Sequence, residues 1–258
     1  SGIPTSRSAR SRAGDILSDT MQTAGVMKNK KVARTLQAYG YYVSSMYGAW
    51  DRRRVVQLAS MNPATSLTPD AAAWLVLALS DDPKTENLRA GLVRYLIGTL
   101  ELEDGKRTMP RRRDRNYEVF ESSARSEALI LSALVAHGVE ESVAESVMQG
   151  LLEQRLDGRW RSPQQNAWAI DSIVRYAEAH PPASGLRGAR LWLDGELGHR
   201  LLVKGDVPDS DAFAVRASDL ASLAGKDELV PVMLEPTKSK ALYYRISLEL
   251  AAGDEGAE

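Results

Sequence analysis

One stretch of this chain, residues 154–168, constrains the fold more than any other, because it has the pattern of a tight corner between two helices. Leu151 and Leu152 close an apolar helical run just before it. Asp157 and Gly158 then supply a turn, at which glycine can adopt a positive φ without strain. The sequence therefore predicts that a helix ends here and that the chain reverses sharply.

A second helix begins directly after this corner. Ser162 has the side chain of an N-cap, Pro163 fits the first helical position, and Gln165 has the spacing of a capping box. We predict a helix from Gln164 to about Ala179. A helix, a Gly-Trp corner and a capped helix together form the repeating corner of an α/α barrel. The residues expected on the buried side of the second helix are Ala167, Trp168, Ile170, Ile173, Val174 and Tyr176.

Upstream of the corner, apolar residues recur at helical spacing as far back as Val32. Thr68 and Pro69 give a clear helix start, and the run that follows is apolar nearly all round, which predicts other helices on several sides of it. A charged loop, with a short hairpin at Asp104-Gly105, separates the later helices. The predicted helices cover residues 32–48, 50–61, 69–79, 83–100, 122–137 and 140–154.

The pattern changes after residues 181–185, Pro-Pro-Ala-Ser-Gly. Leu191 and Leu193 alternate with polar residues, Asp194-Gly195 is a hairpin signal, and Pro231 predicts an edge strand or a bulge. The predicted fold is a partial α/α toroid of paired helices over residues 1–180, followed by a small antiparallel β-sandwich over residues 181–258. Further strand residues are expected at Val203, Phe213, Val215, Tyr244, Ile246, Leu248 and Leu250, and a weak amphipathic piece at Ile16, Met21 and Val26.

Composition excludes several classes of function. Lys plus Arg number 33 against 34 acidic residues, so no global field favours nucleic acid, and no apolar run approaches the length of a membrane span. Cysteine is absent, which removes disulfides, zinc–thiolate sites and thiol nucleophiles from this chain. His137, His180 and His199 are isolated from one another and favour no metal site. We predict no catalytic, cofactor-binding or metal-binding residue.

Three motifs invite a functional reading that their context does not support. Asp81-Asp82 resembles the metal motif of terpenoid synthases, but Pro83 follows at once, so we expect the aspartates to cap a helix. The corner at Gly158 resembles that of squalene-type cyclases, but it occurs once and without an acidic protonation motif. The basic run 111–115 lacks interleaved aromatic residues, and we expect a solvated loop.

The order of these pieces resembles that in the bacterial α2-macroglobulins. In that family the later half of the thioester-containing α/α toroid ends in a Gly-x-Trp-x-Ser-Thr-Gln-x-x-x-Trp/Ala corner. A β-sandwich of the CUB type follows and closes on a Leu-Tyr-Tyr-Arg strand. The likeness is strongest over residues 120–180 and 239–248. The matching pieces are 67–73, 151–168, Tyr176-Ala177 and Ala241-Leu242-Tyr243-Tyr244-Arg245.

The chain departs from the family in two respects. The family's reactive element, Cys-Gly/Leu-Glu-Gln, joins a thiol to a glutamine as an internal thioester, and a chain without cysteine cannot form it. The thioester therefore lies upstream in a longer parent, or this member lacks one. The seven or eight helices counted are also fewer than a closed toroid of this family has. We expect the chain to be a C-terminal fragment whose open toroid edge exposes apolar surface or is covered by other domains or another copy.

The resemblance implies broad-spectrum protease inhibition in the periplasm or at the bacterial cell surface. A protease cuts a bait region, the inhibitor rearranges, and the protease is caged, with covalent capture where a thioester exists. These residues would then act as non-catalytic cover and scaffold. Two alternatives remain: an α/α-toroid enzyme, of the terpenoid cyclase or polysaccharide-cleaving type, with an accessory β domain, or a passive cell-envelope interaction module. Aromatic residues make up 6% of the chain, which argues against an aromatic-lined enzyme cleft.

Overall fold

The computed structural model describes residues 27–47, 51–110, 122–156, 158–181, 187–193, 196–203 and 232–237. Contacts between Cα atoms divide the chain into two compact units, Ser1–Pro181 and Pro182–Glu258. The first contains all the described helices and the second a three-stranded sheet. The described helices are α2 (Lys30–Met46), α3 (Arg52–Ala59), α4 (Pro63–Ser66), α5 (Pro69–Ala78), the 3-10 helix η1 (Pro83–Thr85), α6 (Glu86–Gly98), α7 (Ser123–His137), α8 (Glu141–Glu153) and α9 (Pro163–Ala179).

Side-chain caps fix where the predicted helices begin. The hydroxyls of Thr68, Ser122 and Ser162 accept hydrogen bonds from the backbone N–H three residues on, at 3.1, 3.3 and 3.2 Å. Each satisfies a donor that the first helical turn leaves without a partner. At the other end of α7, Gly138 takes the left-handed conformation, with φ 74°. These predicted boundaries are confirmed.

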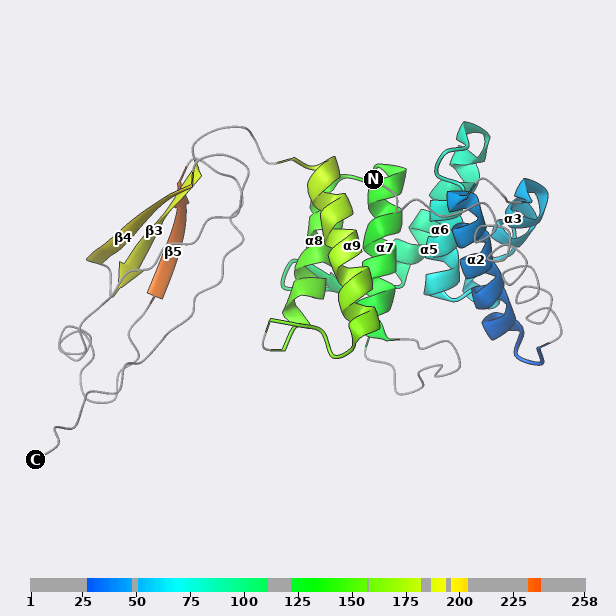
Figure 1. Ribbon diagram of the computed structural model, residues 1–258, viewed down its shortest axis with the longest axis horizontal. Coiled ribbons are helices and arrows are strands. Elements are labelled where there is room, and N and C mark those ends of the chain that lie inside the picture. The colour runs from blue at the N-terminus through cyan, green and yellow to red at the C-terminus, as the bar shows by residue number, and fades with distance from the viewer. Residues whose placement is uncertain are drawn as a thin grey trace, which may run out of the picture. The chain divides into compact units, whose positions relative to one another are not determined.

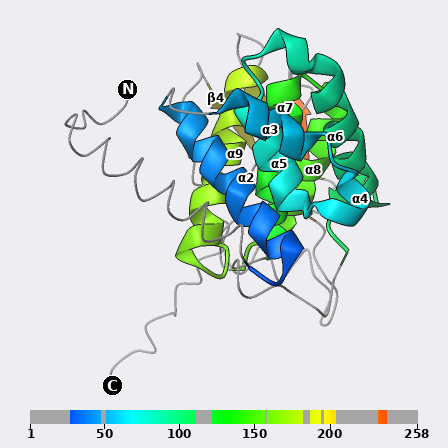
Figure 2. The same cartoon turned by 90° about the vertical axis from the view of Figure 1, so that its right-hand side faces the viewer.

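The helices of the first unit form two layers (Figure 1, Figure 2). In the first layer, α2 packs on α5, α5 on α7, and α7 on α9. The Thr35 and Thr68 hydroxyls lie 2.8 Å apart and the Tyr39 and Trp74 ring centroids 5.0 Å apart, so α2 and α5 run parallel. In the second layer, each helix returns the chain and bridges two members of the first: α3 touches α2 and α5, α6 touches α5 and α7, and α8 touches α7 and α9. This alternation is that of a partial α/α toroid, as predicted.

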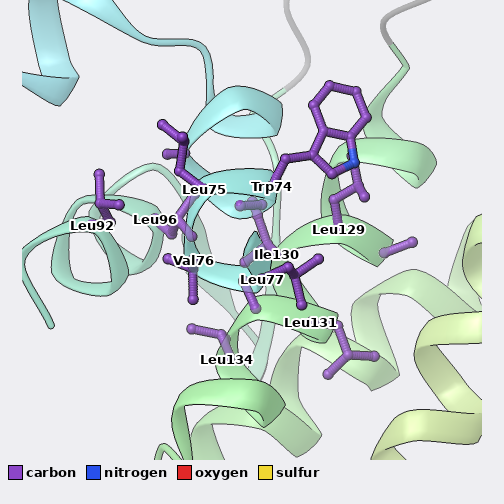
Figure 3. Close-up of a cluster of buried hydrophobic side chains, with 14 of the residues drawn as sticks. Trp74, Leu75, Val76, Leu77, Leu92, Leu96, Leu129, Ile130, Leu131 and Leu134 are labelled. Carbon is purple, nitrogen blue, oxygen red and sulfur yellow. The ribbon is translucent and has the colours of Figure 1, made fainter. Parts of the chain in front are cut away.

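The core lies between α5, α6 and α7 (Figure 3). Every residue of α5 is buried, as is every residue of α7 from Ala124 to Leu134. Figure 3 shows side chains of α5 between those of α6 and those of α7. A helix that is apolar all round needs neighbours on all sides, and the two layers supply them. The fully buried aliphatic side chains here include Leu75, Leu92, Leu96, Leu129, Ile130, Leu131 and Leu134.

A short hairpin packs on α8. Strands β1 (Glu101–Glu103) and β2 (Lys106–Thr108) pair antiparallel around Asp104 and Gly105, which both take positive φ values of 48° and 78°. Two positive φ values are the signature of the tight turn that the sequence predicts here. The hairpin approaches α8 most closely at Gly150, where an added Cβ would lie 2.5 Å from the Arg107 carbonyl oxygen.

In the second unit, the strand order is β4-β3-β5, with both pairs antiparallel. The strands are β3 (Arg187–Leu193), β4 (Glu196–Val203) and β5 (Val232–Thr237). The predicted alternation in β3 breaks between Leu191 and Trp192, where the pairing register with β4 shifts. Both side chains are half-buried as a result. Pro231 immediately precedes β5, which lies at one edge of this described sheet.

Two predictions about the helices need correction. The helix predicted from Pro83 begins as a single 3-10 turn, and α6 proper starts at Glu86. On α9, Trp168 and Ile173 are half-buried and Tyr176 is buried, but Ala167, Ile170 and Val174 are exposed. The six residues expected to be buried span more than one face of a helix, whereas the buried residues of α9, Ala169, Ser172 and Tyr176, lie on one face.

Several predictions lie outside the described residues. They concern the amphipathic piece at 16–26, the basic run 111–115, and the strand residues Phe213, Val215 and 244–250.

Candidate functional site

The corner between α8 and α9 is built from side chains that bond its backbone. Leu156 and Arg159 exchange two backbone hydrogen bonds, at 2.9 and 3.2 Å, around Gly158, whose φ is 77°. The Trp160 indole Nε1 then donates to the Leu151 carbonyl at 3.0 Å, which ties the corner to the last turn of α8. Trp160 is buried. The indole thus fills the gap between two helix ends and gives the Leu151 carbonyl, which also accepts from the Gln154 N–H at 3.3 Å, a second and shorter hydrogen bond.

Asn166 holds the other side of the corner. Its Oδ1 accepts from the Trp160 backbone N–H at 3.2 Å, and its Nδ2 donates to the carbonyls of Trp160 and Ser162 at 2.8 and 2.7 Å. The predicted capping box forms in a modified way. Gln165 reaches back to the Arg161 N–H at 3.1 Å, one residue before the N-cap. The sequence pattern located the start of α9 but did not identify Asn166.

A buried carboxylate joins the corner to the hairpin. Glu127 of α7 is 0% exposed. One of its oxygens accepts from the Met109 backbone N–H at 2.7 Å, just after β2, and the other accepts from the Gln154 amide at the end of α8. Burial raises the pKa of Glu127 to about 7, while both hydrogen bonds act to lower it. We name Glu127, Met109 and Gln154 the Glu127 junction.

A buried ion pair joins α5 to α7. Arg125 donates through Nε to the Asp70 carboxylate at 3.1 Å and pairs with it through a second nitrogen. Both side chains are at most 3% exposed. The guanidinium carbon of Arg125 also lies 5.8 Å from the centroid of the Trp74 ring. Asp70 is in the first turn of α5, so its charge is also favoured by the helix dipole.

Aromatic rings from three helices gather beside this ion pair. Trp74 of α5 stacks at an angle on Tyr39 of α2 and on Trp168 of α9, with centroids 5.0 and 6.2 Å apart. Tyr42 completes the group, 6.4 Å from Trp168. We name these four residues the aromatic cluster. It bridges α2 and α9 across the first layer, and Tyr39, 39% exposed, forms its accessible rim.

The opposite side of α9 carries an exposed apolar stripe. Ile170 and Val174 are 55% and 49% exposed, and Ala167 and Ala177 continue the row at helical spacing. The buried residues Ala169, Ser172 and Tyr176 lie on the other side of the helix. Within the described chain, α9 is the last member of the first layer, and this stripe is the flank on which a further member would pack.

The motifs weighed for metal binding have other partners. Asp82 caps the 3-10 turn by accepting from the Lys84 N–H at 3.0 Å, and its hydrogen bond to Arg52 lowers its pKa. The predicted capping role is confirmed for Asp82, whereas the Asp81 carboxylate accepts from the Ser80 hydroxyl at 3.4 Å. His137 ends α7 near Glu86, and His180 ends α9 stacked on Tyr176, with ring centroids 4.7 Å apart. Across the described ranges, no three His, Asp or Glu side chains cluster as metal ligands would.

No described helix has both the length and the apolar content that a membrane crossing requires.

Sequence reasoning missed the Glu127 junction and the aromatic cluster. A signal for the first was present: Arg125 and Glu127 are charged residues inside a helix that is otherwise small and apolar. Buried charges in such a run need partners, although the sequence does not name them. The aromatic cluster has no comparable signal, because its members are far apart in sequence.

Comparison with known proteins finds solved structures of similar fold. No protein-family model matches the chain, and no curated protein matches its sequence. Two solved structures are similar in fold. Salmonella α2-macroglobulin reacted with methylamine matches with a TM-score of 0.56 and 19% identity, covering 80% of this chain and 12% of that chain. The native conformation of E. coli α2-macroglobulin matches with a TM-score of 0.52 and 17% identity, covering 79% of this chain and 12% of that one.

The chain thus spans about an eighth of the length of the macroglobulins it matches. At this level of identity the match concerns the fold. The resemblance found in the sequence is confirmed at that level: over most of its length, this chain has the fold of a segment of the bacterial α2-macroglobulins.

Proposed function

We propose that this chain is a non-catalytic part of a bacterial macroglobulin-like inhibitor that traps attacking proteases. The observation that carries the proposal is the shared fold over 80% of the chain. The Trp160 corner, whose sequence resembles that of the family's corner, supports it. Residues 1–180 would be the later part of the thioester-type toroid, and residues 181–258 its CUB-like neighbour. The parent protein would act in the periplasm or at the cell surface.

In this role the chain supplies scaffold rather than chemistry. It has no cysteine, so any covalent capture of a protease depends on a cysteine elsewhere in the parent. The exposed stripe at Ile170 and Val174 supports a role in assembly, because apolar side chains in a row on a helix are typical of a packing surface. Other domains of the parent, or another copy, would cover it.

The test uses the full-length parent and trypsin. We expect a single early cut in the bait region, after which the bound trypsin still cleaves a small peptide substrate but no longer cleaves a large protein. A parent carrying Ile170→Lys should trap less trypsin than one carrying Glu178→Gln, an exposed position on the same helix. If the parent is neither cut nor protective of large substrates, the proposed function is wrong.

The rival toroid enzyme is not favoured. Such an enzyme needs acids and aromatic residues around a central cavity, whereas Trp74 and Tyr42 are buried and the nearby Asp70 is engaged by Arg125.

A further inference from the structure

Glu127 is a buried acid whose hydrogen-bond partners are all neutral. It lies inside α7, 0% exposed, and neither of its hydrogen-bond partners is cationic. A buried carboxylate without a cation is costly to ionise, because burial has removed the water that would stabilise its charge. Its two oxygens nevertheless hold two separate segments, the end of the hairpin at Met109 and the end of α8 at Gln154.

The two oxygens are not equivalent when a proton is added. The oxygen facing Met109 accepts from a backbone N–H, which cannot turn round to accept. A proton must therefore sit on the oxygen facing Gln154. The Gln154 side chain can accommodate it by rotating its amide through about 180°, so that Oε1 accepts the new O–H. Both contacts survive protonation, and the buried charge disappears.

The charged groups on the elements around Glu127 are either exposed to solvent or paired with other residues. Glu101, Glu103 and Asp104 of the hairpin are exposed, as are Arg94 of α6, Glu141 of α8, Arg159 and Arg161 of the corner and Glu178 of α9. The others have partners: Lys106 with Glu153, Arg107 with the Ser146 hydroxyl, Arg125 with Asp70, Arg175 with Asp171, Arg89 and His137 with Glu86, Glu145 with Gln149, and Arg155 with the Leu152 carbonyl.

The hairpin and the corner are both joined to α8. The hairpin packs on α8 through Arg107, whose guanidinium reaches Ser146 at 2.9 Å, and through the close approach at Gly150. The corner is joined to α8 by the hydrogen bond from Trp160 to the Leu151 carbonyl. Hairpin, α8 and corner therefore form one body, and the Glu127 junction attaches both ends of that body to α7.

We propose that the Glu127 junction is a proton-controlled latch, which holds the hairpin and corner against α7 when Glu127 is neutral and loosens when it ionises. The pKa of about 7 places the change near neutrality. The sign follows from linkage. The pKa in the folded protein is above the ordinary value of 4.5, so the stabilisation is complete below that value and is lost as the pH rises through about 7.

The test compares the whole chain with Glu127→Gln, a neutral side chain of the same shape. Between pH values of about 5.5 and 8.5, ionisation of Glu127 should raise the unfolding equilibrium constant of the wild type by roughly thirtyfold. Glu127→Gln should lack this rise, and the two proteins should be closest in stability at the acidic end. Glu178→Gln, an exposed control, should behave like the wild type.

A second measurement reports the latch locally. Hydrogen exchange of the Met109 amide, expressed as the ratio of wild type to Glu127→Gln, should increase as the pH rises through about 7. In Gln154→Met the carboxylate loses a hydrogen bond that stabilises it, so the midpoint should move to higher pH. This variant keeps the test decisive if Glu127→Gln does not fold. Identical pH profiles for wild type and Glu127→Gln, or an unmoved midpoint in Gln154→Met, would overturn the proposal.

Discussion

At the scale of single residues, the corner depends on polar side chains that serve the backbone. Trp160 and Asn166 together form hydrogen bonds with three carbonyls and one N–H at the corner where α8 ends and α9 begins. Ser162 and Pro163 could be predicted from sequence, because capping is local. The role of Asn166 could not, since it depends on the path of a chain that has already turned.

Replacing Asn166 with Ala should destabilise the protein by about 2–3 kcal/mol, because two carbonyls and one N–H lose a partner in a partly buried site. The measurement is urea unfolding followed by Trp fluorescence. Gln164→Ala, at an exposed position two residues earlier, should change stability by less than about 0.5 kcal/mol. Equal effects of the two substitutions would contradict the assigned role.

The ion pair between Asp70 and Arg125 gives a second prediction at this scale. Arg125→Met alone should cost about 3–5 kcal/mol, because it leaves a buried carboxylate without its cation. The double variant Asp70→Leu/Arg125→Met should recover much of that loss, since no buried charge remains. A double-mutant cycle by chemical denaturation measures the coupling. Additive losses would show that the pair does not act as a unit.

At the scale of elements, the helices followed from the sequence and their exposed faces did not. Start signals at Thr68 and Ser162 and the stop at Gly138 are local chemistry and were predicted correctly. The predicted burial on α9 was wrong at Ala167, Ile170 and Val174, because burial depends on which neighbouring helices exist. Ile170 would suit a core as well as any other isoleucine, and only the position of α9 at the end of its layer leaves it exposed.

The docking of the hairpin on α8 makes a prediction at Gly150. Gly150→Ala should destabilise the protein, because the new methyl would lie 2.5 Å from a carbonyl oxygen of the hairpin and the two elements must separate. Helix propensity acts in the opposite direction, so the loss is not a propensity effect. Gly91→Ala is the matched control: it lies within α6 with nothing inside 4 Å, and should stabilise by about 0.5–1 kcal/mol. Thermal unfolding of both variants tests the contrast, and stabilisation by both would refute close docking.

At the scale of the whole molecule, the partial toroid separates residues that hold the fold from residues that face outward. The layer α2, α5, α7 and α9 has two interior members, buried along all of α5 and from Ala124 to Leu134 of α7, and two end members that are buried on one side only. The fold class was predictable because the spacing of apolar residues is helical in the first part of the chain and changes to strict alternation in the later part. The aromatic cluster was not, since Tyr39, Trp74 and Trp168 meet only when three hairpins stack.

The end position of α9 predicts how substitutions differ in this chain. Ile170→Lys should change the free energy of unfolding by no more than about 0.5 kcal/mol, because the side chain is 55% exposed. Leu131→Ala, at a fully buried position in α7, should cost about 2–5 kcal/mol. Both are measured by urea unfolding of the same chain. A large loss in Ile170→Lys would mean that the stripe is already covered.

The two-layer alternation also bears on how such a protein changes in evolution. Each inner helix and its returning partner form a repeating module that packs mainly on the modules on either side, and the aromatic cluster reaches further, from α2 and α5 to α9. A further hairpin added beyond α9 would therefore leave the contacts among the described helices intact. The number of such hairpins can then vary without a change in the interior core.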